Sequence, residues 1–399
     1  MSVDLKQEIA LESDALFNDV VRLRRDFHQH PELAYEEHRT SAIVAEYLEG
    51  LGIETIRGVA RTGVVGLLKG TKETNEKPKR VALRADMDAL PMPEKTTHAF
   101  PSKFENKMHA CGHDAHTASL LGAATLLAKH RDDFSGTVQF LFQPAEEVLP
   151  GGAKPMLEAG VFDTPPDAVF GQHCIPQIPA GKIGFCPGPM MAGSDELYFK
   201  ITGTGGHASA PHRSRDPIVA AVQLITSLQT IISRNFPPAS PAVLTIASIH
   251  GGSATNIIPN EVTMMGTLRT MDESLREMAH ERLREMTEFT AKAMGVTAEV
   301  EIRRGYPALV NERDATHFAW QAAKDYLGES NAIAAEPIMG AEDFAYFLQR
   351  ARGTFWQLGV GNESRGIVHN IHSSHFDIDE EALRTGTGLL TYVVRRFLF

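Results

Sequence analysis

The segment MHACGHDAH, residues 108–116, concentrates side chains that can bind metal ions or act as nucleophiles. It holds Cys111, His109, His113, His116 and Asp114. Cys111 and His113 are two residues apart, so they cannot share one helix face, but on a turning segment both can reach one ion. Thiolate and imidazole are preferred ligands of zinc and related transition metals. The segment therefore predicts a metal site, with a Cys111 thiolate nucleophile beside histidine as the alternative.

Further potential ligands follow short apolar runs elsewhere in the chain. Runs of this length indicate strands, and in open α/β sheets the active-site groups collect at the carboxyl ends of the strands. The residues concerned are Asp86 and Asp88 after RVALRA, Glu146 and Glu147 after TVQFLFQ, and His173 at the end of AVFGQH. A segment near the C-terminus, HNIHSSHF, adds His369, His372 and His375. Together they predict nitrogen, oxygen and sulfur ligands at one edge of a sheet.

The elements that must position these residues alternate between helix and strand. Apolar positions recur at helical spacing in 4–25, 38–51 and 115–130. Short apolar runs that indicate strands lie at 63–70, 80–90, 137–143 and 168–173. This alternation predicts an α/β fold with helices on the faces of a sheet.

The pattern changes in the middle of the chain. Strands are expected at 196–203, 242–249, 261–269 and 298–304, and helices at 216–234 and 272–294. Asp216 before Pro217 suits the start of the first helix, and Asp272 and Gly295 suit the two ends of the second. The order β-α-β-β-α-β is typical of a ferredoxin-like module. We expect a catalytic domain in two parts, 1–186 and 307–399, with an inserted domain at 187–306.

Composition limits the classes of function. The 399 residues carry 39 Lys and Arg against 50 Asp and Glu, a net charge of −11, which argues against a nucleic-acid or membrane-surface protein. Three cysteines without a CxxC motif favour a reducing compartment. The N-terminal residues lack a signal-peptide pattern, and no apolar run approaches the ~18 residues of a membrane span. We expect a cytoplasmic protein.

Competing catalytic motifs are absent from the sequence. HExxH, the GxxxxGK[ST] phosphate loop and the GxSxG nucleophile elbow do not occur. GTGGHA, at 203–208, formally fits GxGxxA, but the following SAPHRSRDP cannot begin a helix at once. A dinucleotide site is therefore not expected.

The sequence resembles the M20 metallopeptidases, and most closely their amidohydrolase branch, with hippurate hydrolases, N-acyl-amino-acid amidohydrolases and plant auxin-conjugate hydrolases. The matching motifs run nearly end to end: LRRDFHQHPELAYEEHRT (23–40), RADMDALP (84–91), MHACGHDAHTA (108–118), FQPAEE (142–147), GQH (171–173), GTGGHASAPH (203–212), ATNIIPNEV (254–262), GTLRT (266–270), MGAEDFAYF (339–347) and HSSHFDIDEEAL (372–383). This resemblance implies a metallopeptidase-type α/β catalytic domain whose ferredoxin-like insertion serves as a lid and dimerisation domain.

The resemblance also implies roles for individual residues. It implies a metal set of Cys111, His113, Glu147, His173 and His372, with His372 rather than His375 because HSSHF aligns on its first histidine. It implies Glu146 as general base, taking a proton from water and delivering one to the leaving amine. Two divalent ions would acidify that water and polarise the scissile carbonyl. Asp86 and Asp88 are expected to orient the ligand imidazoles.

The inserted domain is expected to complete the site. In the family pattern His207 reaches an active site, often that of a partner subunit, to stabilise the oxyanion. Asn256 and Arg269 are candidates to hold the substrate carboxylate. We expect a homodimer or homotetramer formed through this domain.

The expected activity is metal-dependent hydrolysis of N-acyl-L-amino acids, hippurate-like or aliphatic, to a carboxylic acid and a free amino acid. Two ions per subunit are expected, of Zn, Mn, Co or Ni, because each suits mixed sulfur, nitrogen and oxygen ligands. A dipeptidase or carboxypeptidase on the same scaffold is the alternative. A cysteine-dependent hydrolase and a metal-binding sensor on an inactive scaffold are two further hypotheses.

Overall fold

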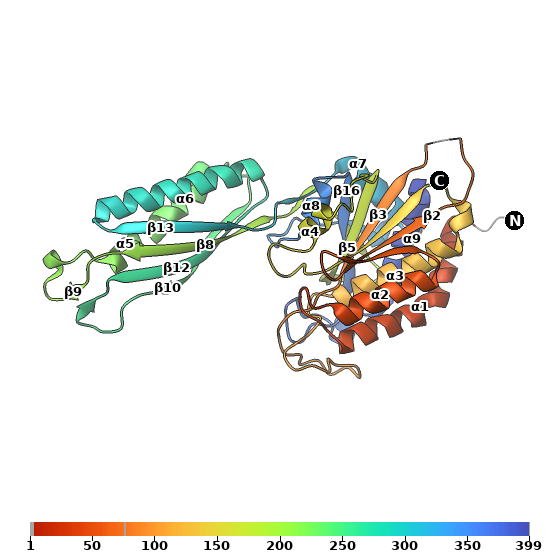
Figure 1. The fold of residues 1–399 in the computed structure, drawn as a ribbon, viewed down its shortest axis with the longest axis horizontal. Helices are drawn as coiled ribbons and strands as arrows, with labels where there is room; N and C mark the ends of the chain where they lie inside the picture. Colours follow the sequence, from red (N-terminus) through yellow and green to blue (C-terminus); the bar gives the residue numbers. More distant parts are fainter. Residues whose placement is uncertain (1–3, 76, 399) are drawn as a thin grey trace. The chain divides into compact units, whose positions relative to one another are not determined.

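The computed structural model describes residues 4–75 and 77–398, which form two compact units (Figure 1). Unit 1 takes the chain up to Gly188, Val310–Glu336 and the residues from Asp343 onward, and unit 2 takes Pro189–Leu309 and Pro337–Glu342. The sequence predicts an insertion at 187–306 and gives no sign of the second segment of unit 2. That segment joins unit 2 because Ile338 pairs with Met191 at the start of the unit.

The sheet of unit 1 has eight strands in the order β1-β2-β4-β3-β5-β16-β6-β15. Their bounds are β1 (Glu54–Val59), β2 (Gly63–Lys69), β3 (Arg80–Asp86), β4 (Thr137–Gln143), β5 (Ala168–Pro179), β6 (Ile183–Phe185), β15 (Ala332–Ala334) and β16 (Gly353–Gly361). The central strands β4, β3, β5 and β16 run parallel, while β2 joins β4, and β6 joins β16, in antiparallel pairs. A parallel centre places the residues that follow these strands at one common edge.

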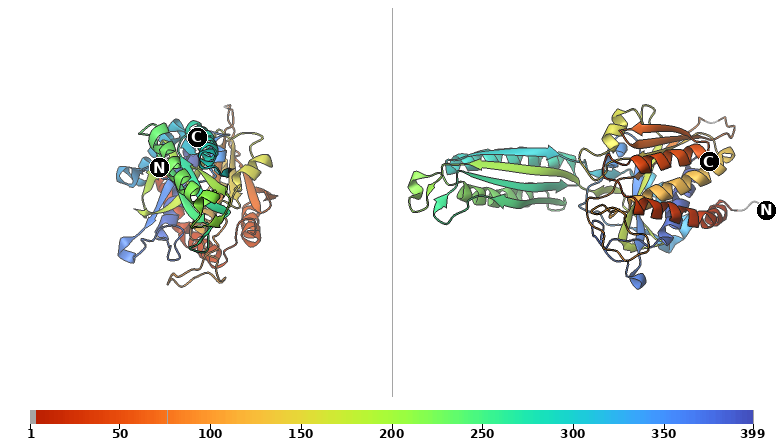
Figure 2. Two further views of the ribbon diagram at one scale, coloured as in Figure 1. Left: turned by 90° about the vertical axis from the view of Figure 1, so that its left-hand side faces the viewer. Right: turned by 60° about the horizontal axis from the view of Figure 1, so that its bottom comes forward.

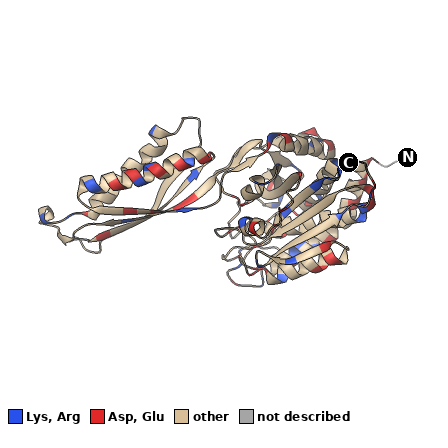
Figure 3. Ribbon diagram, turned by 45° about the horizontal axis from the view of Figure 1, so that its top comes forward, with Lys and Arg blue, Asp and Glu red and all other residues tan. Residues whose placement is uncertain are grey.

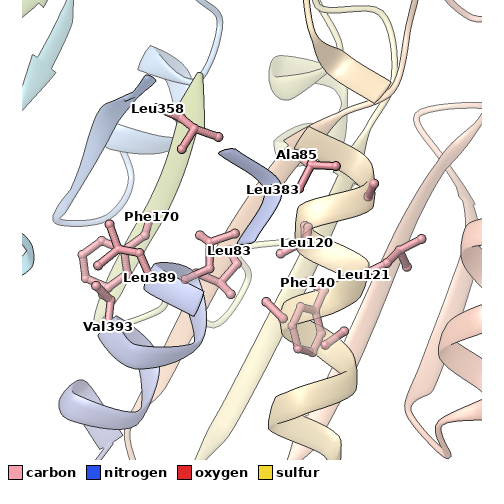
Figure 4. Close-up of a cluster of buried hydrophobic side chains, with 14 of the residues drawn as sticks. Leu83, Ala85, Leu120, Leu121, Phe140, Phe170, Leu358, Leu383, Leu389 and Val393 are labelled. Carbon is pink, nitrogen blue, oxygen red and sulfur yellow. The ribbon is translucent and has the colours of Figure 1, made fainter. Parts of the chain in front are cut away.

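Helices cover this sheet. One hydrophobic core joins it to α1 (Leu5–Gln29), α2 (His38–Gly50), α3 (His113–Lys129), α7 (Arg313–Leu327) and α9 (Glu381–Leu398). The short helices α4 (Ala153–Glu158) and α8 (Ala345–Leu348) contact each other. In Figure 4, Leu83, Phe140, Phe170 and Leu358 from the strands meet residues of α3 and α9. This packing brings α3, with the predicted metal site at its start, onto the sheet.

Gly122 allows α3 to lie tightly between two other helices. A Cβ there would come within 2.9 Å of Val20 on α1 and of Thr387 on α9. Because such contacts are closer than packed atoms tolerate, only glycine fits without a shift. The close approach fixes the axial position of α3 and of the residues at its start.

Unit 2 has a four-stranded antiparallel sheet in the order β10-β12-β8-β13. Its elements are β8 (Gly193–Thr202), α5 (Pro217–Thr230), β10 (Ala242–His250), β12 (Glu261–Thr270), α6 (Glu273–Met294) and β13 (Thr297–Arg304). Both helices share one core with the sheet, and Figure 2 shows the helices and strands of this unit from two further sides. The predicted α/β fold with a ferredoxin-like module is confirmed.

The predicted helix ends of unit 2 are present. Asp216 accepts hydrogen bonds from the first N–H groups of α5, and Asp272 does the same for α6. Gly295 ends α6 with φ 69°, a left-handed conformation that glycine adopts at little cost. The acidic and basic residues of α6, visible in Figure 3, alternate with a buried stripe that includes Ala279, Leu283 and Ala291.

Short strands complete the chain. β9 (Gly206–His207) pairs with β11 (Ile257–Ile258) in unit 2. The chain passes from unit 1 to unit 2 within β7 (Gly188–Met191) and returns to unit 1 within β14 (Leu309–Asn311). Among the helices of residues 4–75 and 77–398, none is both long and apolar enough to cross a bilayer.

Candidate metal centre

Strand register brings the predicted acidic and histidine residues to one edge of the unit 1 sheet. Asp86, the last residue of β3, is opposite Gln143, the last residue of β4. On the other side of β3, Arg84 is opposite Gly171 of β5, so His173 continues β5 to the level of Asp86. Glu146 and Glu147 follow β4 directly, so four potential ligands or bases meet at this edge.

A glycine turn brings the N-terminus of α3 to the same edge. Gly112 has φ 88° and stands between Cys111 and His113, which begins the helix. A Cβ on Gly112 would lie 2.9 Å from the Cβ and 3.0 Å from the Sγ of Cys174. Both the left-handed backbone and the close approach to Cys174 require glycine, which explains the CGH order of the motif.

The five predicted ligands form two overlapping groups. The ligand atoms of Cys111, His113 and His173 lie within 4.8 Å of one another, and Cys111 Sγ is 3.4 Å from His173 Nε2. The ligand atoms of Cys111, Glu147 and His372 form a second group within the same limit, and His372 Nε2 is 3.2 Å from Glu147 Oε1. Because Cys111 belongs to both groups, its sulfur stands between two positions suited to cations.

The imidazoles of His113 and His173 are each held through Nδ1. His113 Nδ1 lies 2.9 Å from the carbonyl oxygen of Asp88, and His173 Nδ1 lies 2.9 Å from that of Cys174. A carbonyl oxygen only accepts hydrogen bonds, so each Nδ1 carries a proton and each Nε2 is available as a ligand. This arrangement is common behind metal-bound histidines.

Two buried polar atoms at the centre of the cluster lack hydrogen-bond partners among the described residues. They are His113 Nε2 and Glu147 Oε1, which are 3.9 Å apart. The His372 ring near Glu147 Oε1 does not satisfy hydrogen-bond geometry. Burying such atoms without partners is costly, and a cation between them would remove that cost. The sulfur, nitrogen and oxygen donor set therefore fits transition-metal ions.

Electrostatics at the site favour positive charge. Burial disfavours a charged His113 ring, but the neighbouring carboxylates, led by Asp86, raise its pKa to about 10. Burial raises the pKa of the Cys111 thiol well above its ordinary value, and the negative charges of Glu147 and Glu146 add to this shift. A bound cation would take the place of the His113 Nε2 proton and would stabilise the Cys111 thiolate.

Asp86 lies in a buried hydrogen-bond network behind the cluster. Its Oδ1 is 2.6 Å from His116 Nδ1, and the Nε2 of that ring accepts a hydrogen bond from the N–H of Cys174. Its Oδ2 accepts a bond from Arg84 and lies 3.5 Å from His113 Nε2. Although burial alone would raise the pKa of Asp86, the charges of Arg84 and the two histidines keep it well below its usual value. The hydrogen bond of Asp86 therefore orients His116, which was not among the predicted ligands.

Asp88 holds the loop that carries the two glutamates. Its Oδ1 accepts a hydrogen bond from the N–H of Glu146, and its Oδ2 accepts one from the N–H of Glu147. Glu146 is buried, and its charge acts on Cys111. The loop thus presents two adjacent carboxylates to the cluster, one of which belongs to the second group of ligands.

The remaining predicted residues lie in unit 2. His207 and Asn256 are neighbours in the β9–β11 region, where the N–H of Ala208 bonds to the Asn256 carbonyl. Arg269 is on β12, half-buried, with its Nε 3.3 Å from Thr267 Oγ1. Burial lowers the pKa of Arg269, against the effect of the Asp195 charge.

Sequence reasoning missed two buried residues that support the site. Arg84 donates hydrogen bonds to Gln143, Asp86 and Asp343, and so ties the ends of β3 and β4 to the segment that leads into α8. His116 was noticed in the motif but given no role. The signal for Arg84 was a charge inside the otherwise apolar run RVALRA, since such a residue is seldom buried unless it is paired.

Comparison with known proteins identifies the family. The model of Peptidase family M20/M25/M40 matches residues 82–396, which span both units. The chain belongs to this family, and it is a metal-dependent hydrolase acting on amide or peptide bonds.

Relatives of this chain carry different names. Thermostable carboxypeptidase 1 of Saccharolobus solfataricus is 42% identical over 387 residues, covering 96% of each chain. N-acetyl-L-cysteine deacetylase of Bacillus subtilis is 40% identical over 383 residues, covering 96% of this chain and 89% of the relative. A crystal structure of the Bacillus subtilis YXEP protein, described as a dinuclear metal binding peptidase from the M20 family, is 35% identical with a TM-score of 0.83, covering 96% and 99% of the two chains.

Proposed function

We propose that the protein is a dinuclear-metal amidohydrolase that converts N-acyl-L-amino acids to a carboxylic acid and a free amino acid. The observation that carries the proposal is the pair of overlapping ligand groups that share Cys111 and surround two buried atoms without hydrogen bonds. In this proposal Cys111, His113, Glu147, His173 and His372 hold two divalent ions of Zn, Mn, Co or Ni. Bound there, the ions would supply Lewis acidity to the scissile carbonyl and acidify a water molecule.

Glu146 is the general base in this proposal. Its carboxylate takes a proton from the attacking water and delivers it to the nitrogen of the leaving amino acid. Glu147 is assigned to the metal because its carboxylate belongs to the second group of candidate ligands, and Glu146, its neighbour on the loop that Asp88 holds, is assigned the role of base. Asp86 and Asp88 keep the surrounding imidazoles and backbone in place.

His207 is proposed to stabilise the oxyanion. Its Nδ1 accepts a hydrogen bond from the N–H of Ser209 at 3.2 Å, so the proton of the neutral ring is on Nε2. The residue is exposed, so this donor is accessible to an oxyanion. Arg269 is proposed to hold the substrate carboxylate through a two-bond contact. Asn256 lies beside His207, so its proposed contact with that carboxylate would come from the partner subunit.

Geometry inside unit 2 supports a role for a partner subunit. Arg269 pairs with Ser194 at the start of β8, whereas β9 with His207 comes after Thr202 at the other end of that strand. At ~3.3 Å per residue, the eight steps from Ser194 to Thr202 span about 26 Å. One chain cannot bring both side chains to a single small substrate, so we propose that His207 acts in the active site of a partner subunit.

Exposed apolar residues in unit 2 support dimer formation through this domain. Ile218, Val219 and Val222 of α5 and Ile249 of the edge strand β10 are all at least one-third exposed. Apolar side chains gathered on one element commonly mark an interface between subunits. We propose a homodimer, or a homotetramer built from it, joined through unit 2.

A carboxypeptidase or dipeptidase activity is the second candidate, favoured by the 42% identity to a thermostable carboxypeptidase. An arginine that binds a carboxylate would serve both reactions. The thiol alternative is disfavoured, because burial and nearby carboxylates raise the pKa of Cys111 in the absence of a cation. The presence of Glu146 beside a complete ligand set argues against an inactive sensor.

A substrate panel tests the proposed activity. Purified enzyme loaded with Zn, Mn, Co or Ni is assayed with hippurate, N-acetyl-L-amino acids and unblocked dipeptides. We expect kcat/KM for the N-acyl amino acids to exceed that for dipeptides with the same C-terminal residue. Faster cleavage of the dipeptides would favour the carboxypeptidase candidate.

A further inference from the structure

Two buried carboxylates bind three consecutive backbone N–H groups in the loop after β4. Asp88 accepts those of Glu146 and Glu147 at 2.9 and 3.0 Å, and Glu37 Oε1 accepts that of Ala145 at 2.8 Å. Both carboxylates come from segments distant in sequence from this loop. The path of the backbone just before Glu146 therefore depends on Glu37.

The carboxylate of Glu37 serves this loop instead of its own helix. Glu37 immediately precedes α2, but its side chain accepts no hydrogen bond from the first turn of that helix. Glu32 does so instead, accepting the N–H groups of Arg39 and Thr40. The Glu37 side chain is fully buried, and its Oε1 also accepts the N–H of Tyr35 while its Oε2 accepts the hydroxyl of Thr62.

The loop needs such a support because its backbone is strained. Ala145 has φ 53°, in the left-handed region that residues with a Cβ disfavour. A strained conformation persists only when surrounding contacts hold it. Tyr35 adds a second support, since its hydroxyl donates a 2.7 Å hydrogen bond to the carbonyl of Gly151. Residues 35–37 thus hold the loop at both of its ends.

We propose that Glu37 is a positioning residue for the general base: it fixes the left-handed backbone of Ala145 and so sets the position of the Glu146 carboxylate. This inference rests on the role proposed for Glu146. Asp88 binds the N–H groups of both Glu146 and Glu147, but only the residue just before Glu146 is also held by Glu37. We therefore expect loss of Glu37 to displace Glu146 and to leave Glu147 and metal binding in place.

Four variants test this proposal: Glu37→Ala, Glu37→Asp, Glu37→Gln and Glu32→Ala. Alanine removes the acceptor, and aspartate keeps the charge but is one methylene too short to reach Ala145. Glutamine keeps Oε1 as acceptor for both N–H groups, and its amide can donate to the Thr62 hydroxyl. Glu32→Ala is the matched control, because it removes a carboxylate that binds two backbone N–H groups at the same helix without touching the loop.

The measurements are metal content, kcat and KM on the best substrate of the wild-type enzyme. We expect the alanine and aspartate variants to lose about 10- to 100-fold in kcat, with KM and metal content unchanged. The glutamine variant and the Glu32→Ala control should stay within about threefold of wild-type kcat. The proposal would be overturned by wild-type kcat in both Glu37→Ala and Glu37→Asp, or by loss of metal from these two variants. A loss of kcat in Glu37→Gln equal to that in Glu37→Ala would also overturn it.

Crystal structures separate this inference from the proposed function. If the wild-type enzyme cleaves no panel substrate, the proposed function fails, but the position of Glu146 can still be compared. We expect Ala145 to leave the left-handed region and Glu146 to move in Glu37→Asp, and both to keep their places in Glu37→Gln. An unmoved loop in Glu37→Asp would contradict the positioning role whatever the activity.

Discussion

Replacing Gly112 by alanine tests whether the turn between Cys111 and His113 is built as described. Alanine at φ 88° costs about 1–2 kcal/mol, the usual penalty of left-handed backbone for a residue with a Cβ. Its Cβ would also lie 2.9 Å from the Cβ of Cys174, which is buried and cannot withdraw into solvent. Overpacking of this kind costs typically ~1–3 kcal/mol. We therefore expect the free energy of unfolding to fall by about 2–5 kcal/mol.

Gly366 provides a matched control for this experiment. Its φ of 72° and ψ of 15° resemble the 88° and 15° of Gly112, but no atom lies within 4 Å of its ideal Cβ. Gly366→Ala should therefore cost only the backbone part, about 1–2 kcal/mol. Urea denaturation in the presence of a chelator measures both variants without a contribution from bound metal. A Gly112→Ala variant that is no more destabilised than Gly366→Ala would contradict the close packing of Gly112 against Cys174.

Four further predictions concern catalysis and pH. Glu146→Gln should retain both metal ions and lose at least about 10²–10⁴ in kcat, and retained turnover would remove Glu146 from the role of base. His207→Ala should lower kcat by about 10²–10³ with metal content unchanged, whereas loss of metal would make His207 a ligand. If His207 acts in a partner subunit, mixing Glu146→Gln with His207→Ala under subunit exchange should restore about a quarter of wild-type activity. Half of the dimers are then hybrids, and each hybrid has one complete site of two. No recovery of activity would place His207 in the site of its own chain. Burial, with the Asp88 charge adding to it and the Thr62 hydroxyl opposing it, raises the pKa of Glu37 from 4.5 to about 7, so its ionised form is disfavoured in the folded state. The difference in unfolding free energy between the metal-free wild type and metal-free Glu37→Gln should then favour the wild type most below pH 4.5. This difference should fall by up to about 3 kcal/mol as pH rises through 7. A difference in unfolding free energy that stays constant or rises with pH would contradict the raised pKa.

The sequence predicts the elements of the site better than the contacts between them. The strand end at Gln143 is visible because the apolar run stops there, whereas β3 ends at Asp86, before the end of the predicted run 80–90. The α3 helix begins at His113, two residues before its predicted start, because the left-handed Gly112 allows a sharp entry into the helix. The CGH motif itself contained this information.

Other features depend on contacts between residues distant in sequence. β16, a central strand, and α9, which covers the sheet, were not predicted as elements, and the parallel pairing of β16 with β5 cannot be read from either segment. Likewise nothing near Glu37 indicates that its carboxylate binds the backbone of Ala145, which lies far along the chain. Such partners are determined by strand order, which local patterns do not specify.

Metal content measured together with activity tests the central claim most directly. Purified protein is analysed for bound transition metals, then assayed with an N-acyl amino acid before chelation, after chelation and after metal is restored. We expect nearly two equivalents per chain, activity that is lost with the metal and recovered with it, and a Cys111→Ala variant that binds less metal. Full activity in metal-free protein would contradict it and would move Cys111 from ligand to nucleophile.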